Sequence, residues 1–590
     1  MHLKILALDF DGTLTNDGVV EDKTWEVLRM VKEAGYVLIL VTGRRLAVIP
    51  ELGPFDELCE AIVAENGATI YYPLINRVET PFGKLADEVV QNLKLLNIGV
   101  EFGEAIAATW TPHDRAVLDS IAKTGYAATL EYNKGAVMVL PPGATKGSGL
   151  KHALAKLGYS TRNVLACGDA ENDRSMFEQA DLSVAVSNAT PNIRNLADLV
   201  LEKKGGEGCR DMLANLVQNK IPPYRCQPNR RINLGNTLKK DPVCLSSFNF
   251  LDSNWCIAGS SGTGKTWIAG LILEQLLDMG YQVCVIDPEG DYRSIKAVPR
   301  TIVFGSAYSP PPAVSDVITL LEYAQINIIL DLCQYNLDEK RDYVRRFLQA
   351  LGGLRARRGV PHWFLLDEAH YFCQWGGDSL SELIMENARA GGFTFITYQV
   401  EGLPEALLNS IDHWIITKLQ HERETQHIQN ILREQGLPVP PSIQFGDIPK
   451  RQFYLSMGNT NQQEPPQSGI VSLDQMSRTT PHVRHLHKYL IAPLPSKKQF
   501  YFHTEHGEAA IKPAASLWEF SQILPLLPID TIRYHLERKD FERWLRDIIK
   551  NDELAHQLRK IDNRMLSDKV LKQTLCDTVN YHFGKQQGSI

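Results

Sequence analysis

The sequence predicts an α/β protein of several domains that ends in a helical region. Short apolar runs alternate with amphipathic stretches, which is the pattern of parallel sheets with covering helices. This alternation occurs twice, on either side of a segment rich in proline and basic residues. From Ser516 onward, Leu, Ile and Trp recur at helical spacing between charged residues. The length of 590 residues is enough for about four domains.

Residues 1–220 form the first α/β series. Between its apolar runs, the amphipathic segments Thr24–Ala34 and Gly147–Leu157 predict helices. The apolar runs predict buried strands at Leu3–Leu8, Val37–Val41, Ala61–Val63 and Val164–Cys167. The next segment, 221–235, contains the run IPPYRCQPNRR and is expected to be a linker.

Residues 236–500 form the second α/β series. Its expected strands are Asn254–Ala258, Gln282–Ile286, Ile326–Leu330, Trp363–Leu366 and Thr394–Thr397. Residues 516–590 are expected to be a small helical domain for docking or assembly. His482, His485 and His487 lie between these two regions and are expected to be solvated rather than metal-bound.

Composition excludes several classes of protein. The net charge of −7 rules out a polybasic protein that coats nucleic acid. No apolar run is long enough for a membrane helix, so no membrane partner is expected. The ten cysteines are scattered, which favours reduced thiols and a cytoplasmic location. The basic run Lys340–Arg358 is either a phosphate-contacting or intersubunit surface or a solvated helix face.

Acidic and basic side chains follow several expected strands of the first series. Asp9 and Asp11 come directly after the first strand. Because α/β sheets bind ligands at the carboxyl ends of their strands, these groups are expected to share one crevice. Paired carboxylates there require a cation or a shared proton. The other groups expected in the crevice are Thr42, Gly43, Lys146, Asp169, Asn172 and Asp173.

These motifs, DFDGTL, Thr42, Lys146 and GDAEND, resemble the haloacid dehalogenase (HAD) phosphatases, in the same order and over about residues 1–215. The resemblance implies a Rossmann-like domain with Asp9 as nucleophile and Asp11 as general acid and base. It also implies that Thr42, Gly43, Lys146 and Asn172 bind phosphate. The implied magnesium (Mg2+) ligands are Asp9, Asp11 through its backbone carbonyl, Asp169 and Asp173.

The same resemblance implies an α/β cap at about residues 83–143. Asn66-Gly67-Ala68 and Ser187-Asn188-Ala189 resemble substrate-side loops of the Cof-like subfamily. A cap closes over the site, excludes water and limits the size of the substrate. We therefore expect a small phosphorylated molecule or a protruding chain end as substrate.

The second series contains a P-loop, GSSGTGKT, after a strand and before a helix. Backbone N–H groups of such a loop bind phosphates, and its lysine reaches the β and γ phosphates. The ATP-binding residues are expected to be Gly259, Ser260, Ser261, Gly262, Thr263, Gly264, Lys265 and Thr266. Thr266 and Asp367 are expected to bind a second magnesium ion, and Glu368 to polarise the attacking water.

The segments VCVIDPEGDY, ENARAGG and TYQ resemble HerA/FtsK-type DNA-translocating ATPases over about residues 230–460. This RecA-like resemblance implies that Asp287 and Gln399 act at the ATP site. It also implies that Arg389 is an arginine finger for a neighbouring subunit, and therefore that the chain forms a homohexamer. The chain differs from the family pattern at Ala390 and Tyr398, and it has no N-terminal barrel.

Three hypotheses remain for function. The first is a bifunctional enzyme that joins a phosphomonoesterase to a DNA-dependent ATPase ring for DNA end processing or repair, with room for a nuclease partner. The second is a sugar or nucleotide phosphatase whose ATPase regulates or assembles the enzyme. The third is an assembly protein in which the phosphatase fold replaces the barrel. The presence of every expected catalytic position in both motif sets argues against the third. The expected cap favours the second, and the resemblance to DNA-translocating ATPases makes the first the preferred hypothesis.

Overall fold

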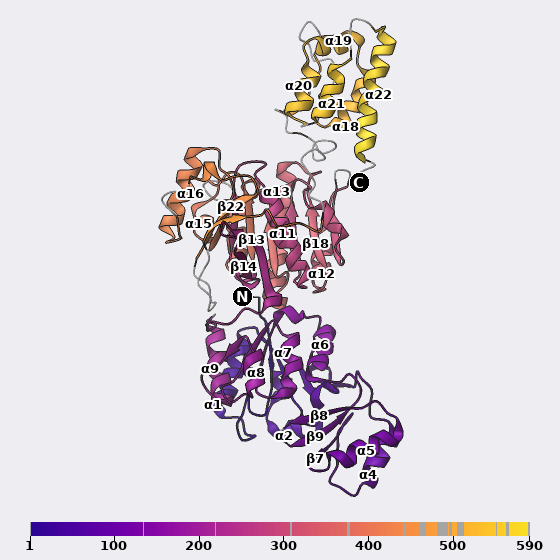
Figure 1. The fold of residues 1–590 in the computed structure, drawn as a ribbon, viewed down its shortest axis with the longest axis vertical. Coiled ribbons are helices and arrows are strands. Elements are labelled where there is room, and N and C mark those ends of the chain that lie inside the picture. The colour runs from indigo at the N-terminus through magenta and orange to yellow at the C-terminus, as the bar shows by residue number, and fades with distance from the viewer. Residues whose placement is uncertain are drawn as a thin grey trace.

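The computed structural model describes residues 2–133, 135–218, 220–306, 309–373, 378–439, 444–458, 468–480, 494, 498–503, 512–549, 551–561 and 566–587. Three sheets and a group of C-terminal helices form successive bodies along the molecule (Figure 1). This arrangement confirms the predicted α/β fold class with a helical C-terminal part. The histidines at 482, 485 and 487 lie outside the described residues.

The first domain is built on an eight-stranded sheet in which six neighbouring strands are parallel. In spatial order the strands are β12 (Leu199–Val200), β11 (Leu182–Ala185), β10 (Val164–Gly168), β1 (Ile5–Leu8), β2 (Val37–Val41), β3 (Ala61–Ala64), β4 (Thr69–Tyr72) and β5 (Arg77–Glu79). Its helices are α1 (Asp22–Glu33), α2 (Ile49–Leu52), α3 (Phe55–Leu58), α6 (Lys146–Leu157), α7 (Arg174–Gln179), α8 (Pro191–Leu196) and α9 (Gly205–Val217).

An antiparallel sheet with two helices is inserted into this domain, and we refer to it as the cap. Its strands, in spatial order, are β6 (Glu101–Phe102), β7 (Ala107–Trp110), β9 (Ala136–Leu140) and β8 (Thr129–Asn133). Its helices, α4 (Asp87–Leu95) and α5 (Asp114–Thr124), cover one face of the sheet. Leu130 and Val139 pack there against Val89, Leu93 and Val117. The apolar side chains of the cap therefore form their own small core.

The second domain has an eleven-stranded sheet with a parallel centre. The seven parallel strands are β21 (His413–Ile416), β15 (Trp255–Ala258), β20 (Phe393–Thr397), β19 (Trp363–Leu366), β16 (Val283–Asp287), β18 (Asn327–Asp331) and β17 (Thr301–Phe304). Antiparallel strands extend one edge: β14 (Pro242–Ser246), β13 (Arg231–Thr237), β23 (Gly469–Ser472) and β22 (Gln452–Met457). Residues 231–235, expected in the linker, instead begin β13 because they pair with β14.

Helices cover the second sheet, and further helices form the C-terminal body. Those of the second domain are α10 (Phe248–Leu251), α11 (Lys265–Asp278), α12 (Val314–Leu321), α13 (Leu337–Arg358), α14 (Ser379–Ala388), α15 (Glu405–Leu408) and α16 (Glu422–Glu434). The C-terminal helices are α18 (Leu517–Ile523), α19 (Ile529–Glu537), α20 (Asp540–Asp547), α21 (Asp552–Arg559) and α22 (Asp568–Gln587). An aromatic core of Phe500, Phe502, Phe520, Phe541 and Trp544 contributes to the packing of the C-terminal body.

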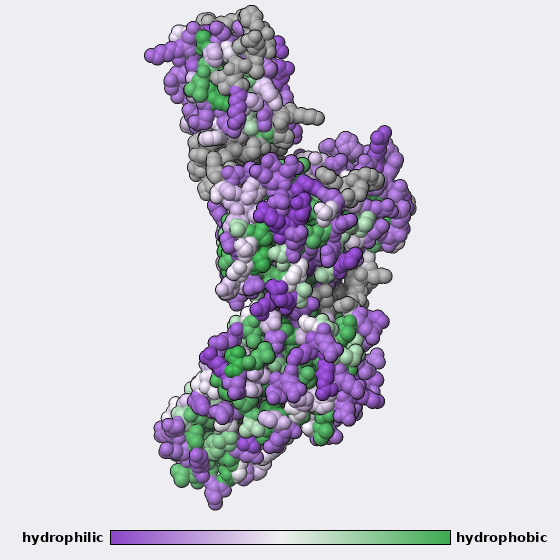
Figure 2. Space-filling view, turned by 180° about the vertical axis from the view of Figure 1, so that it is seen from behind, coloured by the Kyte–Doolittle hydropathy of each residue, from purple (hydrophilic) through white to green (hydrophobic). Residues whose placement is uncertain are grey.

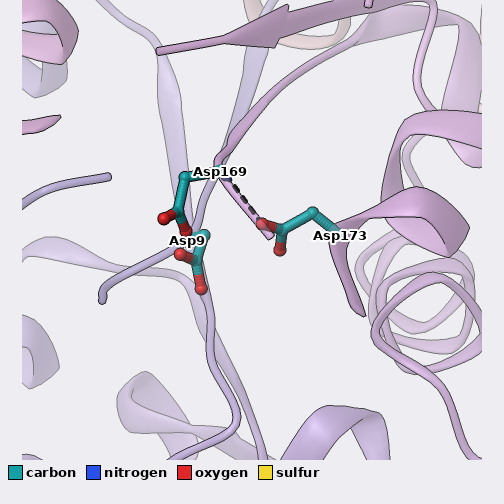
Figure 3. A group of neighbouring side chains, drawn as sticks. All are labelled: Asp9, Asp169 and Asp173. Carbon is teal, nitrogen blue, oxygen red and sulfur yellow. Dashed lines mark hydrogen bonds between the residues drawn. The ribbon is translucent and has the colours of Figure 1, made fainter. Parts of the chain in front are cut away.

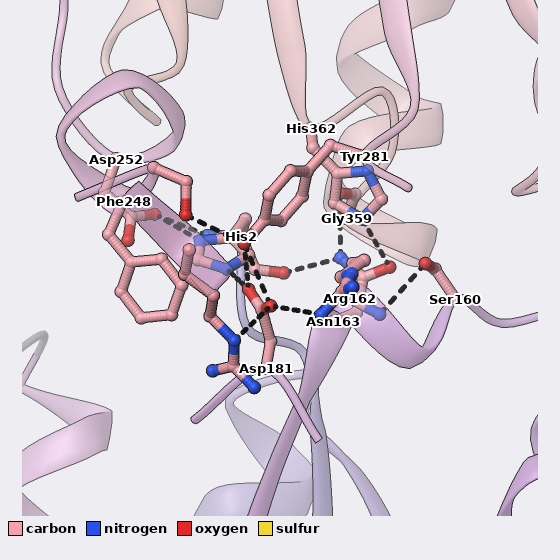
Figure 4. Close-up of polar contacts among 12 residues, drawn as sticks. His2, Ser160, Arg162, Asn163, Asp181, Phe248, Asp252, Tyr281, Gly359 and His362 are labelled. Carbon is pink, nitrogen blue, oxygen red and sulfur yellow. Dashed lines mark hydrogen bonds and ion pairs between the residues drawn. The ribbon is translucent and has the colours of Figure 1, made fainter. Parts of the chain in front are cut away.

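The first two domains meet at the amino ends of their sheets. The buried His2, just before β1, has Nε2 at 2.7 Å from Asp181 and Nδ1 at 3.0 Å from Asp252 (Figure 4). Tyr281 donates its hydroxyl to Asp181 at 3.0 Å. Burial alone lowers the pKa of His2, but the carboxylates of Asp252 and Asp181 outweigh it and raise the pKa to about 9. The imidazole is therefore protonated and bridges one acid from each domain.

A second set of contacts lies beside this ion pair. Asn163 donates Nδ2 to the carbonyl of Gly359 at 3.0 Å, and its Oδ1 lies 3.2 Å from Nε2 of His362 (Figure 4). Nδ1 of His362 accepts the Gln282 N–H, so its Nε2 carries the proton and donates to Asn163. Asn163 precedes β10, and His362 precedes β19. The carboxyl ends of the two sheets therefore point away from each other.

Most of the basic run on α13 makes structural contacts. Arg341 pairs with Asp378, Arg355 donates to the Gly391 carbonyl, and Arg358 donates across the domain interface to the Leu157 carbonyl at 2.8 Å. Arg345 and Arg346 pair with Asp342 on the same helix, and Arg357 pairs with Glu322. These contacts favour a structural role over a surface dedicated to phosphate.

One face of the molecule can be compared by the hydropathy of its residues (Figure 2). Hydrophilic residues cover most of the face seen in Figure 2, and hydrophobic residues form patches between them. In the part of the chain that the structure describes, no helix has the length and apolarity needed to cross a membrane.

We predict that His2→Gln destabilises the two joined domains by about 3 kcal/mol near neutral pH, because it removes the charge that compensates two buried acids. The contribution of His2 to the free energy of unfolding is complete below its ordinary pKa of 6.5. It is lost as the pH rises through about 9. Denaturant unfolding should show that the difference in free energy of unfolding between His2→Gln and the wild type becomes smaller as the pH rises across this range. The exposed His421→Gln is the control, and a difference that does not change with pH would contradict the ion pair.

Candidate functional site

Three carboxylates converge at the carboxyl end of the first sheet. Asp9 follows β1 and Asp169 follows β10, and these two strands are hydrogen-bonded neighbours. Asp173 lies in the short helix Glu171–Asp173, and one carboxylate oxygen of each residue lies within 4.8 Å of the others (Figure 3). Three buried acids at this separation repel one another and raise their affinity for a cation or a proton.

Lys146 supplies positive charge to this cluster. Its Nζ donates to Asp9 Oδ1 and to Asp173 Oδ1, each at 2.6 Å. The residue begins α6, where the Thr145 hydroxyl caps the helix by accepting the Ser148 N–H. Burial alone lowers the pKa of Lys146, but Asp173 and Asp9 outweigh it and raise the pKa above its ordinary value. Burial and Asp173 raise the pKa of Asp9 to about 7, although Lys146 opposes the shift.

Asp173 differs from Asp9 and Asp169 in its hydrogen-bond partners. Its Oδ2 accepts the N–H groups of Asp169 and Ala170 at 2.8 and 2.9 Å, and its Oδ1 accepts from Lys146. These bonds fix the loop that carries Asp169, so Asp173 positions the site more than it offers a free oxygen. Asp9 and Asp169 bring hard carboxylate oxygens together, a donor set that fits a magnesium ion.

Asp11 turns its side chain to a different partner. Its carboxylate accepts two bonds from Arg44, Nε to Oδ2 at 2.9 Å and Nη2 to Oδ1 at 2.7 Å. The expected phosphate-binding Thr42 accepts the Arg44 N–H through its hydroxyl at 3.2 Å. The Asp11 carboxylate is therefore bonded to Arg44 and is not part of the Asp9–Asp169–Asp173 cluster.

Side chains of the core also contact the cap. Asn172 donates to Asn66 Oδ1 at 3.1 Å, and Asn66 in turn donates to the sulfur of Met138 in β9, also at 3.1 Å. The buried carboxylate of Glu65 accepts the N–H groups of Glu104 and Ala105 at 2.9 Å each. These bonds hold the cap sheet close to the carboxylate cluster.

The P-loop, residues 259–266, lies between β15 and α11 at the carboxyl end of the second sheet. Lys265 Nζ donates to the carbonyls of Gly259 and Ser260 at 2.8 and 3.0 Å. The Thr263 hydroxyl lies 2.6 Å from that of Thr417, which follows β21. The lysine thus lies inside the loop it is expected to serve, with Thr266 beside it in the first turn of α11.

Asp367 and Glu368 follow β19 at the same edge of the sheet. Burial and the neighbouring Glu368 raise the pKa of Asp367 well above its ordinary value. Burial raises the pKa of Glu368 to about 7, and Lys265 opposes the shift. Burial and then the charge of Lys265 lower the pKa of His370 to about 4, so this neighbour is neutral. The acids and the P-loop lysine therefore form one electrostatically coupled group.

Asp287 acts on the loop that follows β16. Its Oδ1 accepts the N–H groups of Glu289, Gly290 and Asp291, and its Oδ2 accepts that of Tyr292. In this structure the Asp287 carboxylate therefore holds this loop in place. The loop brings Asp291 close to the site, where burial, then Asp287 and Glu368, raise the pKa of Asp291 to about 8.

Gln399 and Arg389 lie at opposite ends of strand β20 in the second sheet. Gln399 follows β20, whose last residue Thr397 pairs with Ala258 just before the P-loop. Arg389 precedes β20 and lines a cleft of about 900 Å³ between the two domains. The structure therefore places Gln399 at the carboxyl end of the sheet, where the P-loop lies, and Arg389 at the amino end.

The sequence motifs did not identify Arg44, Glu65 or Asp291 as functional residues. Arg44 directly follows the Thr42-Gly43 motif, so its position was a usable signal. Asp291 lies within the DPEGDY segment and was a second acidic candidate there. Glu65 bonds to residues about forty positions away, a distance that no local pattern reveals.

Family models match three parts of the chain. A model of haloacid dehalogenase-like hydrolases matches residues 6–101 and 113–213, and a model of the central domain of the helicase HerA matches residues 232–364. A family of unknown function matches residues 484–580. The chain thus combines an N-terminal HAD-like hydrolase domain with a HerA-type central domain, and these matches support phosphatase and ATPase activities.

Individual relatives align with the first domain. Phosphoglycolate phosphatase 1 of Saccharolobus solfataricus is 27% identical over 235 residues, covering 37% of this chain and 98% of that protein. The 5-amino-6-(5-phospho-D-ribitylamino)uracil phosphatase YcsE of Bacillus subtilis is 25% identical, covering 37% and 97%. A haloacid dehalogenase-like hydrolase structure from Bacteroides thetaiotaomicron has a TM-score of 0.32 and 21% identity, covering 36% of this chain and 99% of its own.

We predict that Asp287→Asn lowers ATPase activity by about tenfold or more. The amide group replaces one accepting oxygen with a donor that faces backbone N–H groups, so the loop loses bonds to a charged acceptor. Hydrogen exchange of the amides at 289–292 should accelerate in the same variant. The exposed Asp338→Asn is the matched control. Wild-type ATPase with unchanged exchange would show that these bonds do not shape the loop.

Proposed function

We propose that this protein is a bifunctional enzyme that joins a magnesium-dependent phosphomonoesterase to a ring-forming, DNA-dependent ATPase. The observation that carries the phosphatase proposal is the bridge from Lys146 to Asp9 and Asp173, next to Asp169, at the carboxyl end of β1 and β10. The P-loop and the coupled Asp367–Glu368 pair support the ATPase.

In the proposed phosphatase reaction, a carboxylate oxygen of Asp9 attacks the phosphorus, and the leaving alcohol takes a proton from Asp11. Water then cleaves the aspartyl-phosphate as Asp11 accepts its proton. Lys146 neutralises charge on the phosphoryl oxygens, with Thr42 and Gly43 offering a hydroxyl and an N–H. A magnesium ion held by Asp9 and Asp169 would supply further charge neutralisation. Arg44 holds Asp11 beside the cluster rather than within it.

In the proposed ATPase reaction, Lys265 and the P-loop N–H groups bind the phosphates, and Glu368 polarises water. Thr266 and Asp367 would hold a magnesium ion, which would supply charge neutralisation at the phosphates. Arg389 lies at the amino end of the sheet, and the P-loop of the same chain lies at the carboxyl end. This separation supports a role for Arg389 at the nucleotide of a neighbouring subunit. A residue that serves a neighbour in this way requires a closed ring, and a homohexamer is the proposed form.

Two substrate classes compete for the phosphatase site. The HerA-type domain supports phosphorylated DNA ends, and with them a role in DNA end processing. The alternative, a small phosphorylated metabolite, is favoured by the cap, which is hydrogen-bonded to the core over the site. Two relatives are named for small substrates: phosphoglycolate, a carboxylate, and a ribitylamino phosphate, a polyol.

We predict that the two activities can be removed separately. Asp9→Asn should abolish phosphatase activity and spare ATPase, because it replaces the nucleophile with a neutral amide at the far end of the molecule from the P-loop. Lys265→Ala should do the reverse. Both rates would be measured on the full chain with p-nitrophenyl phosphate and with ATP. Loss of both activities in either variant would refute two independent sites.

We predict that Arg389→Ala assembles like the wild type but loses ATPase activity by about 10³-fold, the scale expected of an arginine finger. Light scattering would report assembly, and ATP hydrolysis would be measured with and without double-stranded DNA. Arg389→Lys keeps the charge but not the planar donor geometry, and should recover little. Full activity of Arg389→Ala would remove the finger assignment, and the absence of DNA stimulation in the wild type would remove DNA dependence.

A further inference from the structure

Glu131, in cap strand β8, lies on the face of the cap that covers the carboxylate cluster. It is directly opposite Met138 in the antiparallel β8–β9 pair, and directly opposed residues point to the same face of a sheet. The Met138 sulfur accepts a bond from Asn66 of the core, so this face looks toward the core. Glu131 therefore points in the same direction.

The neighbouring positions of β8 agree with this orientation. Leu130 and its partner Val139 point to the opposite face, where they pack against the cap helices. Strand β8 also contacts the short helix Glu171–Asp173, which carries part of the cluster. Glu131 is thus a carboxylate that the cap presents to the phosphatase site from above the phosphoryl-binding groups.

The carboxylate of Glu131 is poorly compensated. Among the described residues its Oε2 is buried and has no hydrogen-bond partner. Burial raises its pKa to about 7, with Lys146 opposing the shift and Asp173 adding to it. A buried oxygen without a partner costs free energy unless a bound molecule supplies a donor. The position and the missing donor together suggest a contact with substrate.

We propose that Glu131 determines substrate specificity by accepting a hydrogen bond from a hydroxyl or amino group on the leaving alcohol of a phosphate monoester. The inference rests on the proposed phosphatase function and names its substrate class, polyol or amino-alcohol phosphates. A substrate whose phosphate lies at Asp9 and Lys146 extends its alcohol portion toward the cap. There the alcohol portion meets Glu131, whose carboxylate accepts a hydrogen bond from a hydroxyl or amino group on it.

The same residue acts against anionic substrates. Asp9, Asp169 and Asp173 already place three acids below the phosphoryl position, and Lys146 is the cation bonded to two of them. A carboxylate on the substrate close to Glu131 would add a further like charge, which is costly in a buried site. A second phosphate beside a DNA end would incur the same penalty. Glu131 therefore favours the metabolite over the DNA end at this site.

The test compares kcat/KM for glycerol phosphate, phosphoglycolate and p-nitrophenyl phosphate on the full chain. The wild type should prefer glycerol phosphate to phosphoglycolate. Glu131→Gln should shift that ratio by about tenfold toward phosphoglycolate, because it removes the like charge, while Glu131→Asp should keep the preference. Glu88→Gln, an exposed carboxylate on α4, should leave the ratio unchanged.

The outcomes separate this inference from the proposed function. An unchanged ratio in Glu131→Gln, or an equal loss with all three substrates, would overturn the specificity role while the wild type remains a phosphatase. A wild type that turns over none of the three, or an Asp9→Asn variant that keeps turnover, would overturn the proposed phosphatase itself.

Discussion

The charged hydrogen bonds of His2 join the two domains at the amino ends of their sheets. The imidazolium joins Asp181, just before β11, to Asp252, just before β15, so the amino ends of the two sheets face each other. In parallel sheets, ligands bind at the carboxyl ends of the strands. The two candidate sites consequently lie at opposite ends of the joined domains and open in opposite directions. Neither site can donate a side chain to the other within one chain, so the two reactions do not share residues.

Both sites concentrate acids around one buried lysine, but the lysines respond differently. Lys146 bonds directly to two carboxylates, and its pKa is raised. Lys265 instead donates to two carbonyls of its own loop, and burial lowers its pKa although Glu368 and Asp367 oppose the shift. A lysine bonded to a neutral carbonyl is easier to transfer to a phosphate than a lysine paired with two carboxylates, because the carbonyl attracts the ammonium less strongly. This difference suits a nucleotide-binding loop in one domain and an ion-paired acidic cluster around the proposed nucleophile in the other.

The sequence predicted the parts of the sites that follow strands directly. Asp9, Asp169 and Asp367 could be placed because an apolar strand and its carboxyl end are local features. The ion pair of Asp11 with Arg44 and the orientation of Glu131 could not be predicted, since they depend on side-chain rotamers and on the register of a cap sheet. The basic run of α13 was ambiguous for a related reason: the partners of Arg341, Arg355, Arg357 and Arg358 lie on other elements.

The cleft beside the His2 contact links the proposed ring to the phosphatase domain. Arg389 lines this cleft together with Lys4, which belongs to the first domain, and Arg355 of α13. A neighbouring subunit that presents its nucleotide to Arg389 must therefore approach the first domain as well. Ring assembly would then depend on the relative placement of the two domains, which the His2 contact fixes. In the proposed ring the phosphatase domain would therefore have a structural position in addition to its own chemistry, and the domain interface would serve both roles.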